Sequence, residues 1–571
     1  MNPNGTGCIS AEDGILGSPG YMWDGNHTLL GIKFGGASAA PDPAAAYDGD
    51  QVIIVKTDGT TFANGDGWKC ITCGVPEENK LAINSNIVDY PQAFRDGKRA
   101  LVGTNILDCG DNDIISDACT PEQTRIYPIA ADGTGGIMRE LRIHPDGIHL
   151  GYSNLFRLDG KFEQLGTMGR LTFDETPAEG APRYELSDIS FMLSPDPQKS
   201  GRFISVDPEN PDHLLFDDGV AVVGEFRGWT NDGKSILGIG SQDSFNYDVF
   251  TTDLQTGEST RRTTDPAYTD PVKTSPDDEW TVLMDGRVDD RMYFASALPV
   301  PPLIELANSS ALGYLYNNGD RRFFQPYLVD QYGERGEYQG QQINGGGDEA
   351  PGNGGISDPL WAGRADPQWS PDGTNIVYYQ ALVSAPACGP DNPQVRICPT
   401  SNEQGGRDSR LMIAELTDRR PDPRPAPEPI SDDIPWGTPW EEGDPIPVRG
   451  HVPPGTYILE GHHSGEARVV LTENDSKTDV NTVDVTYTDY SNDGDNFING
   501  TESSERTPYT WHADLTITDR DGNVVGTRKT SEPEGFVVIP EPGQLAGIAT
   551  ITGTLTTTVG DRIYRSPTTG N

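Results

Sequence analysis

A short motif recurs along most of the chain: an extended apolar stretch, a tight turn containing Asp-Gly, and a β-rich stretch. The clearest copy runs from Asp366 to Tyr379 and contains Trp369-Ser-Pro-Asp372-Gly. Equivalent turn aspartates stand at Asp24, Asp96, Asp146, Asp232 and Asp277. Asp-Gly between apolar segments favours a β-hairpin, because Gly accepts a positive φ and Asp bonds its own backbone. A repeat of such hairpins predicts an all-β chain built from similar sheets.

The spacing of the turns indicates a β-propeller. Asp232 and Asp277 are 45 residues apart, close to the ~40–45 residues of one four-stranded blade. Larger gaps elsewhere imply insertions. Six turns favour six blades, with five or seven also open because residues 300–360 are hard to assign. Over residues 15–445 the units resemble the Ser-Pro-Asp-Gly repeats of TolB-type propellers, which gives a predicted propeller domain over residues 1–445.

The sequence changes character after the last repeat. Residues 418–446 are rich in Pro, Asp and Trp and read as a stiff linker or a strap that closes the blades. Beyond them, period-two segments such as Ala467-Arg-Val-Val-Leu-Thr lack the turn motif. Residues 447–571 are therefore expected to form a separate accessory β-sandwich.

Charge excludes some partners and cysteines suggest a compartment. The net charge of -45 argues against nucleic-acid and anionic-membrane binding, and no apolar run reaches the ~18 residues of a membrane span. The partner that we expect is a small molecule. Cysteine spacing predicts disulfides 70–73, 109–119 and 388–398, with Cys8 unpaired; a redox or half-zinc role for the first pair is the alternative. Together with five Asn-x-Ser/Thr sites, this predicts a secreted glycoprotein whose signal peptide has been removed.

The repeat register also selects candidate site residues. The innermost strand of each blade should begin on the face opposite the Asp-Gly turns, around the central channel. In five of the six blades a carboxylate stands six or seven positions before the turn Asp. The resulting catalytic candidates are Asp89, Glu140, Glu225, Asp270 and Asp366. Arg139, Arg142, Arg227 and Arg364 stand beside them. A structural alternative is that these acids cap turns or pair with the neighbouring arginines.

Carboxylates mixed with guanidinium groups suggest hydrolysis of an acidic sugar. Glycosidic cleavage needs one carboxyl group as acid and another as nucleophile or base, while Arg offers a bidentate fork to a substrate carboxylate. We expect Arg227 and Arg364 to hold that carboxylate. Further substrate contacts are expected from Arg142, Tyr90, Trp229 and Trp361.

Other chemistries are disfavoured by what the sequence lacks. We expect no cofactor, because no nucleotide-binding fingerprint occurs. We also expect no metal, because His144 and His149 flank a turn on the wrong face. A serine peptidase is disfavoured, because no Gly-x-Ser-x-Gly elbow is present.

Several strings resemble secreted fungal saponin hydrolases, mainly within the first 110 residues. They include Asn2-Pro-Asn-Gly-Thr-Gly-Cys8, Trp68-Lys-Cys-Ile-Thr-Cys-Gly and Tyr90-Pro-Gln-Ala-Phe-Arg-Asp-Gly-Lys98. The resemblance implies a β-glucuronidase-type hydrolase that separates a triterpenoid aglycone from the glucuronic acid of its sugar chain, and it names no catalytic pair. Two alternatives stay open: a uronate-specific polysaccharide lyase, which would release an unsaturated product, and a non-catalytic TolB-like binding propeller.

Overall fold

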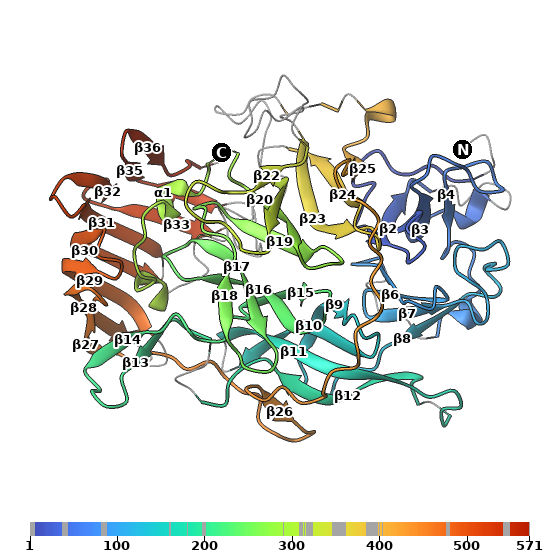
Figure 1. Ribbon diagram of the computed structural model, residues 1–571, viewed down its shortest axis with the longest axis horizontal. Coiled ribbons are helices and arrows are strands. Elements are labelled where there is room, and N and C mark those ends of the chain that lie inside the picture. The colour runs from blue at the N-terminus through green and yellow to red at the C-terminus, as the bar shows by residue number, and fades with distance from the viewer. Residues whose placement is uncertain are drawn as a thin grey trace.

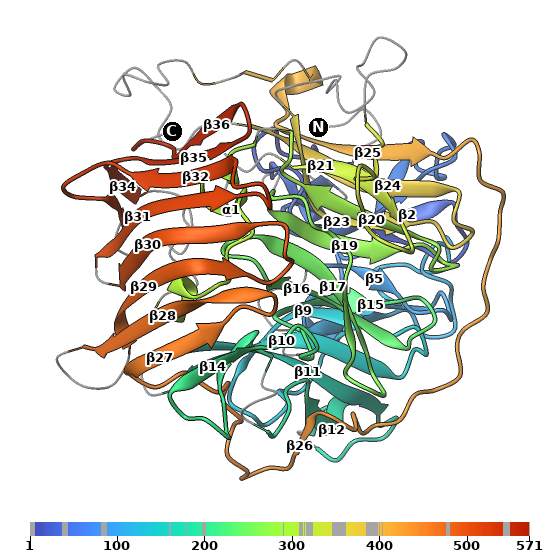
Figure 2. The same ribbon diagram turned by 60° about the vertical axis from the view of Figure 1, so that its left-hand side comes forward.

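In a computed structural model of the chain, six small antiparallel sheets stand around one axis as a six-bladed β-propeller, and a larger sheet lies beside them (Figures 1 and 2). The structure describes residues 6–36, 44–81, 88–158, 161–179, 181–196, 201–288, 290–307, 312, 315, 324–344, 361–383, 398, 400–401, 403–474, 480–506, 508–540 and 549–569. The repeat-based prediction of an all-β propeller with six blades is confirmed.

The blades follow one another in chain order. Blade 1 contains β1 (Gly20–Tyr21), β2 (His27–Phe34), β3 (Gly49–Lys56) and β4 (Trp68–Cys70). Blade 2 contains β5 (Gln92–Ala93), β6 (Arg99–Val102), β7 (Asn105–Asp108) and β8 (Arg125–Pro128). Blade 3 contains β9 (Ile137–Ile143), β10 (His149–Leu158), β11 (Lys161–Phe173) and β12 (Tyr184–Phe191), extended by β26 (Thr438–Trp440).

The remaining blades have the same order from the axis outward. Blade 4 contains β15 (Glu225–Trp229), β16 (Ser235–Ser241), β17 (Tyr247–Asp253) and β18 (Ser259–Arg261). Blade 5 contains β19 (Thr269–Thr274), β20 (Trp280–Asp285), β21 (Gln325–Asp330) and β22 (Gln341–Gln342). Blade 6 contains β23 (Trp361–Trp369), β24 (Asn375–Leu382) and β25 (Ser409–Glu415). Short helical turns are η1 (Ala44–Ala46), η2 (Glu77–Asn79), α1 (Tyr293–Ser296), η4 (Ile304–Leu306) and η7 (Gln404–Gly406).

The Asp-Gly turns explain why each repeat forms a blade. In all six turns the Asp Oδ1 accepts a hydrogen bond from the backbone N–H two residues later, as Asp232 does from Lys234 at 3.0 Å. The next residue has a positive φ in every copy, for example +73° at Gly233. Asp278 replaces glycine in blade 5 and still adopts a φ of +57°. Each turn therefore joins an innermost strand to its second strand.

Apolar cores lie between neighbouring blades, and two segments tie the ring together. Trp229 and Phe226 of blade 4, for example, share a core with Met168 of blade 3. Residues 9–15 bridge β2 of blade 1 and bond to residues 408–409 of blade 6. The strap, residues 419–440, then crosses the turns and reaches blade 3 as β26.

The C-terminal residues form one sheet rather than the expected sandwich. It consists of β27 (Gly455–Glu460), β28 (Ser464–Glu473), β29 (Val480–Ser491), β30 (Phe497–Arg506), β31 (Tyr509–Thr518), β32 (Val524–Thr530), β33 (Phe536–Pro540), β34 (Ala549–Thr552), β35 (Leu555–Val559) and β36 (Arg562–Arg565). Two strands from the connection between blades 3 and 4, β13 (Ile204–Val206) and β14 (His213–Phe216), extend its edge, with β14 parallel to β27.

The propeller itself covers the apolar face of this sheet, so a second sheet is not required. Phe294 and Leu298 from the α1 region share a buried core with Leu515 and Trp511. The buried Arg528 side chain donates a hydrogen bond to the Ala295 carbonyl at 2.6 Å. Period-two patterning indicates a sheet with one buried face, but it does not encode which part of the chain covers that face.

Two predicted disulfides are confirmed, Cys70–Cys73 and Cys109–Cys119, and Cys8 is free. The predicted third pair lies outside the described residues at Cys388. Disulfides are typical of proteins that fold in an oxidising compartment. Among the described residues, no helix is both long and apolar enough to cross a membrane.

Candidate functional site

The innermost strands of blades 3 to 6 are each interrupted by a β-bulge at the predicted site residues. In β9 the pairing shifts between Arg139 and Arg142, around Glu140. Shifts of the same kind surround Arg227 in β15, Asp270 in β19 and Asp366 in β23. Glu140 also has a φ of +56°. Bulges and strained backbone re-aim side chains and occur often beside active sites, and here they bring charged groups from four blades together.

Arg227 lies at the centre of this charged cluster. Its Nε lies 2.8 Å from Asp270 Oδ1 and its Nη2 lies 3.2 Å from Asp366 Oδ1. Its Nη1 lies 2.6 Å from Glu140 Oε2 and 3.4 Å from Glu225 Oε1. The predicted fork to a substrate carboxylate at Arg227 is therefore already occupied by four protein carboxylates. This arginine holds the acids together rather than offering a free guanidinium group.

Two further arginines complete the cluster. Arg142 Nη2 lies 2.5 Å from Asp366 Oδ2, and its guanidinium group stacks on the Tyr90 ring at 3.9 Å. Arg139 bridges two acids: Nη2 pairs with Glu140, and Nη1 lies 2.7 Å from Glu225 Oε1. With all four acids ionised, the three arginines leave one negative charge uncompensated. One contributor was not expected from the sequence, Tyr268, whose hydroxyl donates to Asp270 at 2.7 Å.

The two glutamates have opposite shifts of pKa. Burial alone would raise the pKa of Glu140, but Arg227, Arg139 and Arg142 outweigh it and hold that pKa below its usual value. Burial raises the pKa of Glu225, and the charges of Asp270 and Glu140 add to the rise against the opposing effect of Arg227. Environments that separate the pKa values of neighbouring acids are characteristic of acid–base pairs.

The cluster is closed at one end and open at the other. The side chains of Arg227 and Glu140 are 3% and 4% exposed, whereas those of Glu225 and Arg139 are 26% and 39% exposed. Access from solvent therefore leads first to Glu225 and Arg139. These two residues stand near the starts of β15 and β9, on the face opposite the Asp-Gly turns.

The other predicted residues differ in how far they are buried. Asp89 is half-buried beside Tyr90, and its carbonyl accepts a hydrogen bond from Gly103. Trp229 is fully buried and its indole N–H lies 3.5 Å from the Arg142 carbonyl, so it packs between blades and is not available to a substrate. Trp361 is also buried, with the Arg410 guanidinium group 4.2 Å from its ring centre. Arg364 is buried in β23.

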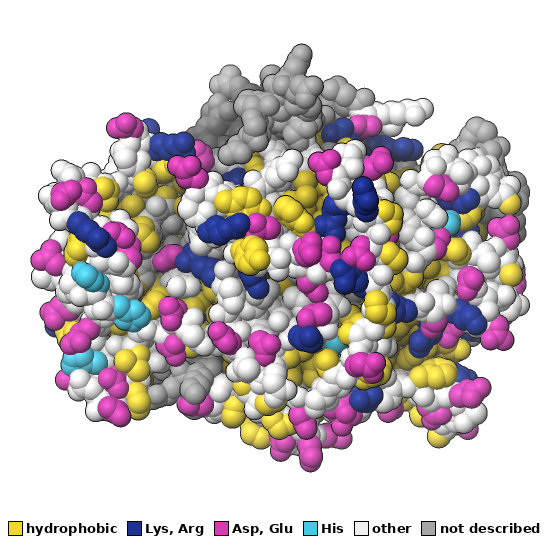
Figure 3. Space-filling model, viewed as in Figure 1, with side chains coloured by type: hydrophobic (Ala, Val, Ile, Leu, Met, Phe, Trp, Pro, Cys, Tyr) yellow, Lys and Arg dark blue, Asp and Glu magenta, His cyan; other side chains and the backbone are white. Residues whose placement is uncertain are grey.

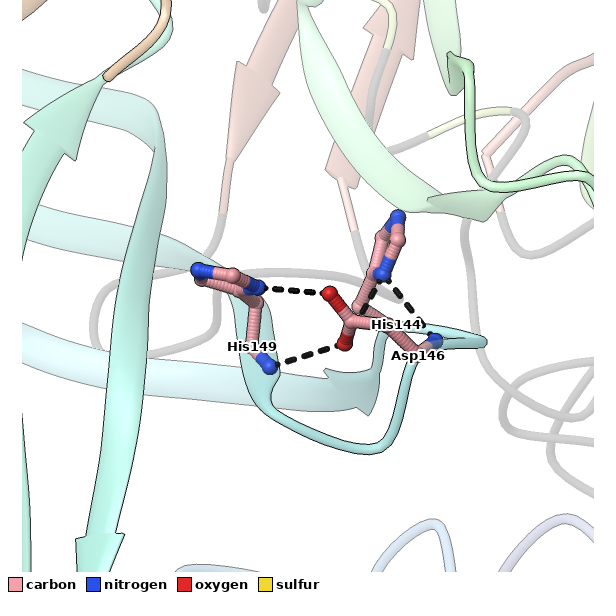
Figure 4. Close-up of side chains that lie close together, drawn as sticks. All are labelled: His144, Asp146 and His149. Atoms are coloured by element: carbon pink, nitrogen blue, oxygen red, sulfur yellow. Dashed lines mark hydrogen bonds and ion pairs between the residues drawn. The ribbon is translucent and has the colours of Figure 1, made fainter. Parts of the chain in front are cut away.

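Three residues on the turn face could in principle ligate a metal. His144, Asp146 and His149 place their ligand atoms within 4.8 Å of one another (Figure 4). The histidines lie on the turn face, as the sequence predicts. Their polar atoms are already engaged: Asp146 Oδ2 lies 2.7 Å from His149 Nδ1, and His144 Nε2 lies 2.9 Å from the Gly233 carbonyl. A metal would have to displace these hydrogen bonds, so the arrangement fits a locked turn better than a metal centre.

The group also connects the turn to the strap. His149 Nε2 lies 2.8 Å from Asp432 Oδ1, and Arg170 Nε donates to the same oxygen at 2.7 Å. Burial alone would lower the pKa of His149, but hydrogen bonds to Asp146 and Asp432 raise it above its usual value. The protonated form of the imidazole is therefore the form that this junction stabilises.

Comparisons with known proteins give distant likenesses. A putative TolB from Agrobacterium tumefaciens is 14% identical, with a TM-score of 0.29, over 61% of this chain and 80% of that one. TolB from Acinetobacter baumannii is 13% identical, with a TM-score of 0.30, over 68% of this chain and 66% of that one. Prolyl oligopeptidase B from Galerina marginata is 12% identical, with a TM-score of 0.30, over 83% of this chain and 46% of that one. No activity is carried over from these proteins.

No protein-family model matches the sequence, and no curated protein matches it.

Proposed function

We propose that the chain is a glycoside hydrolase that acts on glucuronides, with Glu225 as the general acid and Glu140 as its ionised partner. The observation that carries this proposal is the opposite pKa shift of two glutamates joined by the same two arginines. A carboxyl group with a raised pKa can protonate the leaving oxygen, and an ionised one can stabilise or attack the developing cation.

The spacing of the pair favours retention of configuration. One Glu140 oxygen and one Glu225 oxygen contact the same Arg227 nitrogen at 2.6 and 3.4 Å. Those oxygens are therefore at most about 6 Å apart, nearer the ~5–5.5 Å of retaining enzymes than the ~6.5–9.5 Å of inverting ones.

Arg139 is the arginine best placed to receive a substrate carboxylate. Its side chain is 39% exposed and bridges the two glutamates. A glucuronate carboxylate that competes for this guanidinium group would free one oxygen of Glu140 as the sugar enters. The role first expected of Arg227 thus passes to its exposed neighbour, because only an accessible guanidinium group can form a bidentate pair with a ligand.

The resemblance to saponin hydrolases supplies the proposed substrate, a triterpenoid glucuronide. The two disulfides and the candidate glycosylation sites support secretion as the proposed localisation.

The test is product analysis with soyasaponin and with aryl and alkyl glucuronides. Glu225→Gln should retain turnover of a nitrophenyl glucuronide, whose leaving group needs little protonation, and lose that of an alkyl glucuronide. Glu140→Gln should lose both. Glu403→Gln, which neutralises an Arg-paired glutamate in blade 6, is the matched control and should lose neither.

Two results would contradict the proposal. An unsaturated product that absorbs in the ultraviolet would identify a lyase. Absence of turnover with every glycoside, with binding retained in both glutamine variants, would identify a binding propeller.

A further inference from the structure

A hollow lies on the turn side of the propeller, away from the charged cluster. It has a volume of about 130 Å³ and is lined by residues from all six blades and by Arg424 of the strap. Lys273 belongs to its wall and stands three residues after Asp270 on β19. At ~3.3 Å per residue, Lys273 is about 10 Å along the strand from the charged cluster. We call this hollow the turn-face pocket.

The charge of the turn-face pocket is opposite to that of the protein. The chain carries a net charge of -45, and acidic side chains are spread over the face seen in Figure 3. Yet Lys273, Arg95 and Arg424 line the pocket, and none of its described lining residues is Asp or Glu, although Arg424 pairs at 2.6 Å with Asp422 just outside the lining. An acid-free, cationic hollow in so acidic a chain indicates an anionic ligand.

Lys273 has an unused ammonium group. It is half-buried, and within the described part of the chain its Nζ forms no hydrogen bond and no ion pair. Arg95 at the rim stacks on Trp23 at 3.9 Å and donates to the Arg424 carbonyl, and it too has no carboxylate partner among these residues. Asp278 and Asp366 attract Lys273 at longer range, but neither cation contacts a carboxylate among the described residues, so a bound anion would lower their free energy.

The walls of the pocket are aromatic. Tyr21, Trp23, Phe94 and Trp369 contribute to them, and the Trp369 indole donates to the Lys273 carbonyl at 3.1 Å, which fixes one wall against the lysine. A cavity of about 150 Å³ is known to accept benzene, so the volume suits one six-membered ring. Aromatic side chains would pack against such a ring.

We propose that the turn-face pocket binds a small aromatic monocarboxylate, with its ring between the aromatic walls and its carboxylate on Lys273. This site is separate from the glutamate pair and does not depend on the glucuronidase proposal.

Protonation of Lys273 should accompany binding. Burial, with the positive charge of Arg142 as the second cause, lowers the pKa of Lys273 to about 8. Asp278 and Asp366 oppose this shift, and His144 and Arg95 also border the pocket. Because a carboxylate favours the charged ammonium, affinity should be constant below pH 8 and fall about tenfold per pH unit above it.

The experiment is titration of the full chain with benzoate, followed by tryptophan fluorescence and calorimetry. Benzamide, of the same shape but neutral, and acetate, without the ring, are the ligand controls. Benzoate should bind at least tenfold more tightly than either. Lys273→Met should weaken benzoate binding at least tenfold, and Lys529→Met, which removes a surface lysine paired with Asp514, should not change it.

Three outcomes would overturn the proposal. Equal binding of benzoate and benzamide would show an apolar pocket without anion recognition. Equal binding of benzoate and acetate would show a general anion site without ring recognition. Absence of benzoate binding by the wild-type chain would remove the site altogether. Should Lys273→Met not fold, the pH dependence and proton uptake of the wild-type chain still decide the question.

Discussion

Replacement of Arg227 by Met should strongly destabilise the propeller, because this side chain pairs with four buried or half-buried carboxylates. Asp366 keeps Arg142, and Glu140 and Glu225 keep Arg139. Asp270 has no other arginine among the described residues and keeps only the Tyr268 hydroxyl. Breaking a buried ion pair by removing one partner costs about 3–5 kcal/mol, and we expect the Arg227→Met loss to reach this range at pH 7.

The uncompensated charge on Asp270 should account for much of that loss. Asp270→Asn added to Arg227→Met should therefore recover part of the stability, with a coupling energy of about 1–3 kcal/mol in a double-mutant cycle. The loss should also shrink between pH 7 and pH 5, because carboxylates left without the arginine take up protons more readily.

The assay is urea unfolding followed by tryptophan fluorescence. Arg335→Met is the control, because Arg335 pairs with Asp330 at the surface with its side chain 49% exposed; such pairs contribute less than about 1 kcal/mol. Equal losses of unfolding free energy in the two arginine variants, or no recovery of it in the double variant, would refute the view that Arg227 holds the charged cluster together.

Three further predictions concern the rest of the molecule. Burial raises the pKa of Glu305 to about 8, so the protonated carboxyl group favours the folded state and the stability of the wild type falls as pH rises toward 8. The melting temperature of Glu305→Gln should therefore exceed that of the wild type by a margin that grows between pH 5 and pH 9. Asp432→Asn removes a carboxylate that His149 shares with Arg170. The part of the loss that comes from His149, about 1 kcal/mol, should be present at pH 6 and diminish as pH rises above the raised folded-state pKa of His149, whereas the part from Arg170 should not change with pH. A chain that ends at residue 446 leaves Phe294 and Leu298 uncovered and should aggregate in size-exclusion chromatography, whereas a propeller with its own closed core would elute as a monomer.

The amino-acid sequence alone predicts most of the charged residues that converge, because an offset of six or seven residues from the turn Asp selects a carboxylate in five of the six blades. The shared Asp-Gly turn fixes where each innermost strand begins, and this places Glu140, Glu225, Asp270 and Asp366 at one end of the propeller axis. The offset depends only on strand length and on the antiparallel hairpin, both of which are local properties.

What could not be predicted depends on contacts between blades. Counting residues gives no sign that Arg227 is surrounded by four acids, because those contacts depend on bulges whose extra residue has no sequence signature here. Trp229 is predicted from the sequence to contact a substrate, but it lies within the core between blades 3 and 4. The α1 region covers the C-terminal sheet through contacts between residues far apart in the sequence. The local pattern does not encode such contacts, and it therefore predicted a sandwich.

The uneven exposure of the charged cluster argues that it does more than tie blades together. An ion pair that is exposed to water contributes least to stability, because solvent screens it. In this cluster Glu225 and Arg139 are accessible, whereas Arg227 and Glu140 are buried. An active site needs this asymmetry, with an ionised group held in place and an acid within reach of the substrate. Glu225→Gln should therefore abolish turnover of alkyl glucuronides while changing the free energy of unfolding by less than about 1 kcal/mol, whereas Arg227→Met should impair both. If Glu225→Gln instead destabilised the protein as much as Arg227→Met does, the cluster would have a purely structural role, and another residue would have to be the general acid.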